Sequence, residues 1–423
     1  MISADLVVAG CRQLLTCGGP IPKRGEALRE VGLVESAWIA SAGGRIVFVG
    51  PEKKFKETVR PADRSEVIDG SGLVGTPGFV DSHTHLPFAG NREQEFMLRL
   101  KGATYQDLAA KGMGIQTTVR ATRLASKEEL VALCLKRLDV MLIHGTTTAE
   151  AKSGYGLNLE DEVKQLEALR EAQAKHPVTI VPTFMGAHEV PPEFKGRNQE
   201  YIDLLIRRVI PEVGRRRLAE FFDVFCEPGV FSLQETRRLA EAALSEGFKV
   251  RIHADEFMTL GGAELAAEIG AYSADHLISI SDEGIRKLAA SNTVATLLPG
   301  VSFFLMLGRQ APARRLIEAG AVVALASDFN PGSSMINSML FVLQLGVLTL
   351  KMSLEEAVNA ATANAAFALG RHAECGSLEP GKAMDLVLWD VPSYLTLAYH
   401  LGVNPVRYVI KNGRAVVRDG RIF

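Results

Sequence analysis

Five of the nine histidines in this chain lie at or near the ends of short apolar runs that resemble β-strands. His83 and His85 are two residues apart, so on a strand both imidazoles point to the same side. His253 and Asp328 lie at the ends of two further runs and can complete a site with this pair. Imidazoles combined with a carboxylate suit a divalent transition metal such as zinc or iron. Such an ion lowers the pKa of a bound water toward about 7, which makes hydroxide available at neutral pH. The alternative is that each histidine is a core residue with a satisfied ring N–H.

These residues require a fold that brings strand ends together. Between residues 77 and 378, eight short apolar runs alternate with segments of helical periodicity, including Glu160–Lys175, Leu233–Glu246 and Glu283–Ala290. This alternation predicts a (β/α)8 barrel, in which catalytic groups sit at the carboxyl ends of the strands. A doubly wound sheet is the weaker alternative, because no G-x-G-x-x-G follows the first run. The eight runs are Phe79–His85, Gly145–Lys152, Thr179–His188, Asp223–Glu227, Lys249–Glu256, Ser273–His276, Thr293–Pro299 and Val322–Asp328.

The two ends of the chain have a different pattern. Residues 1–76 contain alternating apolar runs broken by glycine pairs, which is typical of a small antiparallel β unit. Residues 379–423 are similar, and Asn412-Gly413 between two β-rich runs predicts a hairpin. Neither piece has enough strands to be stable alone. We therefore expect both ends to pair into one composite β-sandwich domain beside a barrel domain of residues 77–378.

Composition excludes several classes of protein. The 423 residues carry 47 basic and 49 acidic side chains, which argues against a nucleic-acid partner bound through a bulk positive field. The longest apolar stretch, Met339–Leu350, is too short to cross a bilayer, so we expect no membrane partner. We expect the same apolar stretch to lie on the surface, where it would favour a homodimer. The five scattered cysteines lack C-x-x-C spacing and indicate reduced thiols in a cytoplasmic protein.

The segment Pro77–His85, which reads P-G-F-V-D-S-H-T-H, resembles the metal-binding strand of the amidohydrolase superfamily. That superfamily has further histidines on strands five and six and an aspartate on strand eight, which His253, His276 and Asp328 match. Other segments resemble a branch of the superfamily that opens an imidazolone ring carrying a propionate group. These segments are Gly90–Glu93, Ala149–Gly156, Phe184–His188, Ile252–Glu256, Ser273–His276 and Ser327–Ser334.

The resemblance implies a metal-dependent hydrolase that cleaves the C–N bond of a small cyclic amide. It implies one zinc or iron ion, held by His83, His85, His253 and Asp328. Asp328 then accepts the proton of the attacking water, and His276 stabilises the developing oxyanion. Asp328 or Glu256 returns a proton to the leaving nitrogen. The substrate-binding residues implied are Arg92, which can hold the propionate through its planar fork, with Tyr155, His188, Glu256, Asn330, Gly332 and Ser333.

Several alternatives remain open from the sequence. Binuclear amidohydrolases bridge two metals with a carboxylated lysine, usually on strand four, where this chain has none. We therefore expect a single metal and interpret Lys152 as a charge partner. A related deaminase or cyclic-amidine hydrolase keeps the metal ligands but has no need of the set Arg92, Tyr155 and His188. A non-catalytic barrel is expected to lack a ligand, and this chain has all four.

Overall fold

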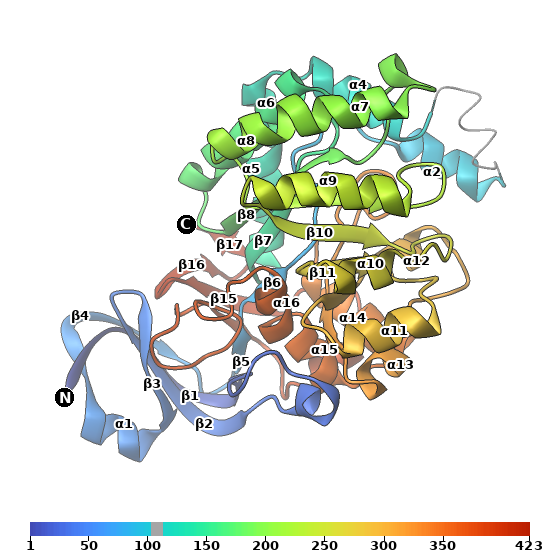
Figure 1. Ribbon diagram of the computed structural model, residues 1–423. Helices are drawn as coiled ribbons and strands as arrows, with labels where there is room; N and C mark the ends of the chain where they lie inside the picture. The colour runs from blue at the N-terminus through green and yellow to red at the C-terminus, as the bar shows by residue number, and fades with distance from the viewer. Residues whose placement is uncertain (103–112) are drawn as a thin grey trace.

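The structure is a computed structural model that describes residues 1–102 and 113–423. Its larger part is a barrel of eight parallel strands in the order β6 to β13, surrounded by helices (Figure 1). Each of the eight predicted apolar runs overlaps one strand of the barrel, which confirms the predicted fold class. The strands are β6 (Phe79–Asp81), β7 (Thr146–Lys152), β8 (Thr179–Ala187), β9 (Phe221–Cys226), β10 (Lys249–Ala254), β11 (Ser273–His276), β12 (Val294–Leu297) and β13 (Val322–Leu325).

Several helices around the barrel begin at a residue whose side chain caps the first turn. For example, α9 (Leu233–Ser245) starts with a capping box, in which the Ser232 hydroxyl accepts from Glu235 N and the Glu235 carboxylate accepts from Ser232 N. The predicted helical segments correspond to α6 (Leu159–Lys175), α9 and α11 (Asp282–Ala289). Further α-helices are α2 (Glu93–Leu100), α4 (Ile115–Leu124), α5 (Lys127–Ile143), α7 (Asn198–Leu204), α8 (Ile210–Arg215), α10 (Gly262–Glu268), α12 (Pro299–Phe304), α13 (Ala313–Glu318), α14 (Met339–Leu350), α15 (Leu354–Ala360), α16 (Ala363–Ala368) and α17 (Thr396–Tyr399).

The segments after β6 and β13 join the first and last strands of the barrel. Asp328 N donates to His83 O at 3.0 Å, and His85 N donates to Phe329 O at 3.0 Å. Below this point, the buried Asp81 carboxylate accepts from Ser327 N and from the Ser327 hydroxyl. The closure therefore places the histidine pair of the first strand directly beside the aspartate that follows the last.

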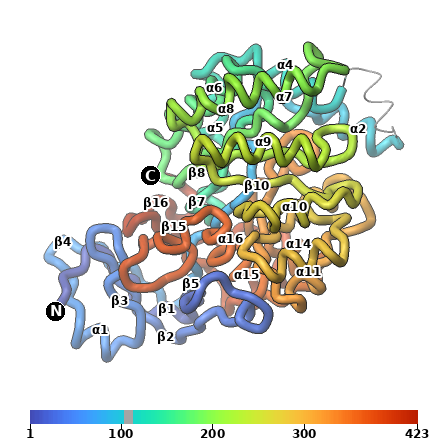
Figure 2. Tube along the Cα trace, in the orientation of Figure 1, coloured from blue at the N-terminus to red at the C-terminus, as the bar shows by residue number. Residues whose placement is uncertain are grey.

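Strands from both ends of the chain form a second, nine-stranded sheet. Its order is β17-β16-β15-β14-β5-β1-β2-β3, with β4 also paired to β1. Figure 2 shows the blue N-terminal segment beside the red C-terminal one, and β5 joins them by pairing with both β1 and β14. The strands are β1 (Ile2–Leu15), β2 (Leu33–Ala42), β3 (Arg45–Pro51), β4 (Val59–Asp69), β5 (Val74–Pro77), β14 (Leu386–Trp389), β15 (Val406–Lys411), β16 (Arg414–Arg418) and β17 (Arg421–Ile422), and α1 (Glu52–Thr58) joins β3 to β4.

This sheet differs from the expected antiparallel unit in one respect. The strand β1 pairs in parallel with β4 and β5, because the chain crosses over before returning to it. The predicted hairpin is present: Asn412 and Gly413 both have positive φ, 48° and 70°, between the antiparallel strands β15 and β16. The domain boundaries at 76/77 and 378/379 stay a prediction.

The apolar stretch Met339–Leu350 forms helix α14, and most of it is buried within the chain. Reading it as a surface segment was therefore wrong, and the helix gives no support for a homodimer. Its side chains are apolar on nearly every face because the surrounding helices and barrel strands cover it. In the described part of the chain, every helix is too short or too polar to span a membrane.

Candidate active site

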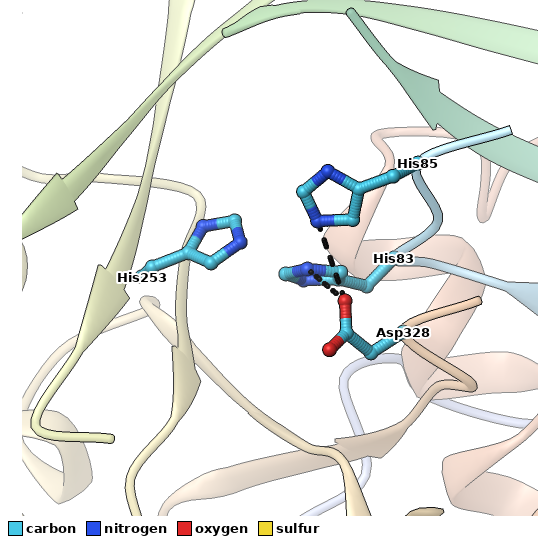
Figure 3. Close-up of side chains that lie close together, drawn as sticks. All are labelled: His83, His85, His253 and Asp328. Carbon is cyan, nitrogen blue, oxygen red and sulfur yellow. Dashed lines mark ion pairs between the residues drawn. The ribbon is translucent and has the colours of Figure 1, made fainter. Parts of the chain in front are cut away.

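Four side chains converge at the carboxyl end of the barrel (Figure 3). His83 and His85 follow β6, His253 lies in β10, and Asp328 follows β13. One potential ligand atom from each residue lies within 4.8 Å of all the others. Asp328 Oδ1 is 3.2 Å from His83 Nε2 and 3.3 Å from His85 Nε2. Asp328 has a φ of 51°, a left-handed conformation that few non-glycine residues adopt, so the backbone is strained at this point.

The donor set fits a metal cation. His83 Nε2, His253 Nε2 and Asp328 Oδ1 are buried, and none has a hydrogen-bond partner among residues 1–102 and 113–423. A buried polar atom without a partner is costly, and native structures contain few of them. Here the three atoms lie in one cluster, so a single cation would satisfy all of them. The four side chains are the three imidazoles and one carboxylate that suit zinc or iron.

A second set of buried groups orients the cluster histidines. His83 Nδ1 lies 2.7 Å from Asp275 Oδ2, and His253 Nδ1 lies 3.0 Å from Asp223 Oδ1. Because a carboxylate only accepts, Nδ1 of each imidazole carries the proton and Nε2 is left as a ligand atom. Asp275 is in turn bound by Arg251 at 3.0 Å. Burial opposes its charge, but Arg251 and His83 together hold the pKa of Asp275 below its ordinary value.

Lys152 is a buried charge partner, as the sequence predicts. Its ammonium lies 2.8 Å from Glu150 Oε1 and 2.9 Å from Asp223 Oδ2. Burial works against the charge, yet Asp223 and Glu150 raise the pKa of Lys152 above its ordinary value. Glu150 also accepts a hydrogen bond from Thr84 N, the residue between His83 and His85. Over the two described ranges, the His83–His85–His253–Asp328 group is the one cluster able to hold a metal, and Lys152 is outside it.

A cavity of about 270 Å³ opens above the cluster. Every residue that the sequence proposes for substrate binding or catalysis lines it, together with three of the cluster residues. These are His85, Arg92, Tyr155, His188, His253, Glu256, His276, Asp328, Asn330, Gly332 and Ser333. The structure thus brings the proposed residues together, while the role of each stays a prediction.

Six lining residues were missed by the sequence reasoning: Glu95, Arg99, Ile115, Phe225, Phe257 and Leu305. Glu95 and Arg99 are on α2, four residues apart, and Arg92 precedes that helix. Their i, i+4 spacing was the available signal, since residues at this spacing share a helix face.

Arg92 is already paired with a carboxylate. Its Nε donates to Glu95 Oε2 at 2.9 Å, and its Nη2 contacts Glu95 Oε1. Glu95 is buried and also accepts from Gly114 N at 2.9 Å. The Nε–Nη2 edge of the guanidinium is therefore occupied, and Nη1 is left for a ligand.

Loop 328–334 connects a cluster residue to the cavity wall. The Asn330 side chain donates to Asp328 O and accepts from Gly332 N and Ser333 N, all at 2.8–2.9 Å. The Ser333 hydroxyl lies 3.3 Å from Asp328 Oδ2. A side chain at position 332 would place its Cβ 2.1 Å from Arg92 Nη1, so the close approach of the guanidinium requires glycine.

Tyr155 and His188 form the opposite wall. The imidazole of His188 stacks on that of His85, with ring centroids 5.0 Å apart, and lies 5.2 Å from the ring of Tyr155. His188 Nδ1 donates to Gly154 O at 2.9 Å, so its Nε2 is an acceptor. Burial lowers the pKa of His188 well below its usual range, which keeps the ring neutral.

His276 and Glu256 lie beside the cluster without belonging to it. Glu256 Oε1 is 3.6 Å from His276 Nδ1, and both ring nitrogens of His276 are buried without a hydrogen-bond partner among the residues the structure describes. Burial, then the charges of Asp328 and Glu227, raise the pKa of Glu256 well above its usual range. Glu256 is held in place because Glu227 accepts from its backbone N–H. A protonated carboxyl can donate a proton. Burial lowers the pKa of His276 well below its usual range, and its neutral imidazole can donate a hydrogen bond into the cavity.

Comparison with known proteins finds relatives over the whole chain and a solved structure with a similar fold. The profile of the amidohydrolase family matches residues 74–416. The chain is 51% identical over 423 residues to an imidazolonepropionase of Symbiobacterium thermophilum, covering 100% of this chain and 99% of the relative. It is 51% identical to an imidazolonepropionase of Geobacillus kaustophilus, covering 99% of each. A solved adenosine deaminase of Xanthomonas campestris with bound zinc has a similar fold, with a TM-score of 0.67 and 18% identity over 100% of this chain and 95% of that one.

Proposed function

This chain belongs to the amidohydrolase family, and on that basis we propose the reaction that it catalyses. It hydrolyses the ring amide of 4-imidazolone-5-propanoate to N-formimidoyl-L-glutamate, a step of histidine degradation. Water adds across the C–N bond of the cyclic amide, so the carbonyl carbon becomes a new carboxylate and the ring nitrogen leaves with a proton. The observation that carries this function is the single cavity that joins the His/Asp cluster to Arg92, Tyr155 and His188.

The buried cluster and the family support a bound metal ion, and we propose zinc or iron on His83, His85, His253 and Asp328. When bound, the ion supplies Lewis acidity and lowers the pKa of water at the site. The protein orients His83 and His253 so that Nε2 of each ring is free to bind the metal. The hydrogen bonds from Nδ1 of these rings to Asp275 and Asp223 fix that orientation. Because the five cysteines are free and buried, we also propose a cytoplasmic location.

The remaining residues bind the substrate and move protons. Arg92 faces the propionate, and Tyr155 and His188 contact the ring. Asn330, Gly332 and Ser333 bind through the loop that follows Asp328. Asp328 accepts the proton of the attacking water, as the one carboxylate within the cluster.

Two donors act on the later steps. His276 donates a hydrogen bond to the developing oxyanion. Glu256, whose raised pKa favours the protonated form, can give the proton to the leaving nitrogen, and Asp328 is the alternative donor.

The test combines elemental analysis with an assay. Protein purified without chelator is analysed for metal and then given 4-imidazolone-5-propanoate. We expect close to one metal per chain and the appearance of N-formimidoyl-L-glutamate. Stoichiometry near two, or retained metal in a His83→Ala/His85→Ala double variant, would overturn the metal site. Activity on a cyclic amidine without a carboxylate, and none on the imidazolone, would favour the related deaminase or cyclic-amidine hydrolase.

A further inference from the structure

The guanidinium groups of Arg92 and Arg99 line the active-site cavity, and they differ in how closely a carboxylate approaches them. Arg92 forms a two-point ion pair with the buried Glu95, so its positive charge is largely offset at the site. Arg99, which lies one turn after Glu95 on α2, also lines the cavity. Within the described residues, Arg99 has no carboxylate at ion-pair distance. Two guanidinium groups and one carboxylate leave a net positive charge on this wall, and Arg99 is the group without an ion-pair partner among the described residues.

Arg99 is held in position by contacts that leave part of its fork free. Its guanidinium carbon lies 5.9 Å from the ring centre of Phe96 and 5.6 Å from that of Phe304. Its Nη2 donates to Gly332 O at 3.0 Å, whereas its Nε has no acceptor among the residues of the described ranges. Burial lowers the pKa of Arg99 below its ordinary value; the charge of Arg92 adds to this shift, and the charge of Glu95 opposes it.

Both arginines meet at the same glycine. Arg92 Nη1 packs against the open side of Gly332, and Arg99 bonds the carbonyl of that residue. Gly332 belongs to loop 328–334, whose side-chain bonds lead back to Asp328. A carboxylate bound between the two guanidinium groups would therefore lie at a fixed place relative to the cluster.

We propose that Arg99 is a second carboxylate-binding residue of this site and supplies the charge that selects an anionic substrate. Arg92, held by Glu95, contributes a directed Nη1 donor but little net attraction. The inference deepens the proposed function and rests on it for the identity of the carboxylate, which is the propionate group. A carboxylate gains more from an unpaired cation in a partly buried cavity than from one already neutralised.

The test compares an acid with its neutral counterpart. Imidazole-4-propanoate and its primary amide are titrated calorimetrically into metal-loaded enzyme, and the ratio of their Kd values is measured. We expect the wild type to bind the acid more tightly. Arg99→Met keeps the apolar stem over Phe96 and Phe304 and removes the charge. It should reduce the acid-over-amide preference about 10- to 100-fold, the worth of a hydrogen bond to a charged group.

Two further variants separate charge recognition from structure. Arg99→Lys keeps the charge and should recover part of the preference, which a purely structural role would not predict. Lys101→Gln removes an exposed positive charge two residues away and should leave the ratio unchanged. The proposal is overturned if the wild type shows no preference, or if Arg99→Met retains it while Arg92→Gln abolishes it.

The same experiment distinguishes this inference from the proposed function. If the wild type prefers the acid through Arg99 but does not hydrolyse 4-imidazolone-5-propanoate, the reaction is wrong and the carboxylate site stands. If hydrolysis occurs and its KM and the binding ratio are unchanged in Arg99→Met, the reaction stands and Arg99 has no part in recognition.

Discussion

His83 Nδ1 lies 2.7 Å from Asp275 Oδ2, and both side chains are fully buried. This bond turns Nε2 of His83 toward the cluster and fixes the tautomer able to bind a metal. Asp275→Asn should weaken metal binding about 10- to 100-fold, as for other residues that orient a histidine ligand. Competition with a chelator of known affinity measures the change. Asp282→Asn, at an exposed aspartate with no contact to the cluster, is the matched control. Unchanged metal affinity in Asp275→Asn would contradict this role.

His276 is expected to act on the transition state and not on the metal. It lies beside His83 and His253, with ring centroids 5.5 and 5.0 Å away, yet it is outside the four-residue cluster. His276→Ala should keep its metal and most of its substrate affinity while kcat falls about 10²–10³-fold, the usual cost of losing one oxyanion donor. Metal lost in step with activity would make His276 a ligand. A raised KM with an unchanged kcat would make it a uniform binding group.

Arg92 is expected to bind the propionate through Nη1, the guanidinium nitrogen that does not contact Glu95. Arg92→Ala should lower kcat/KM for 4-imidazolone-5-propanoate by about tenfold or more, because a hydrogen bond to a charged group is lost. Arg92→Lys should recover only part of this, since lysine cannot keep the two-point contact with Glu95. Steady-state kinetics on the three enzymes checks the order. A value for Arg92→Ala within twofold of wild type would remove Arg92 from substrate recognition.

Lys152 is expected to stabilise the barrel rather than the reaction. Replacing it with Met leaves Glu150 and Asp223 buried without their shared cation, which typically costs about 3–5 kcal/mol in the free energy of unfolding. Lys175→Met removes an exposed lysine from Glu171 and should cost less than about 1 kcal/mol. Denaturant unfolding of both variants gives the comparison. Equal, small losses in the two variants would show that the buried network is not held by Lys152.

The barrel and the metal cluster were accessible from the sequence because their signals are local. Each strand is a short apolar run, and a histidine or aspartate at its carboxyl end must face the barrel mouth. The partners of the cluster histidines were not accessible, because they depend on the tertiary fold. Asp275 pairs in register with His253 but bonds His83 across the barrel, and Asp223 pairs with Arg251 but bonds His253. Nothing in the local sequence specifies those contacts.

Two other features depended on packing between distant segments. Helix α14 is buried because other elements pack around it, and the local sequence does not show this. The prediction of a surface segment was therefore wrong for a helix that is apolar on nearly every face. The pairing of Arg92 with Glu95 follows from the direction of α2, which places the carboxylate over the arginine that precedes the helix. The residue types were visible in the sequence. Which charged side chains of the cavity wall form ion pairs with one another could be seen only from the side-chain geometry.

The central claim is that water cleaves a ring amide at this site, and the fate of the water oxygen tests it most directly. Metal-loaded enzyme is incubated with 4-imidazolone-5-propanoate in water enriched in heavy oxygen, and the product is analysed by mass spectrometry, with free ammonia measured in parallel. The account predicts N-formimidoyl-L-glutamate with one heavy oxygen in its newly formed carboxylate and no ammonia released. Unchanged substrate, or a product with its ring intact and ammonia released, would contradict it.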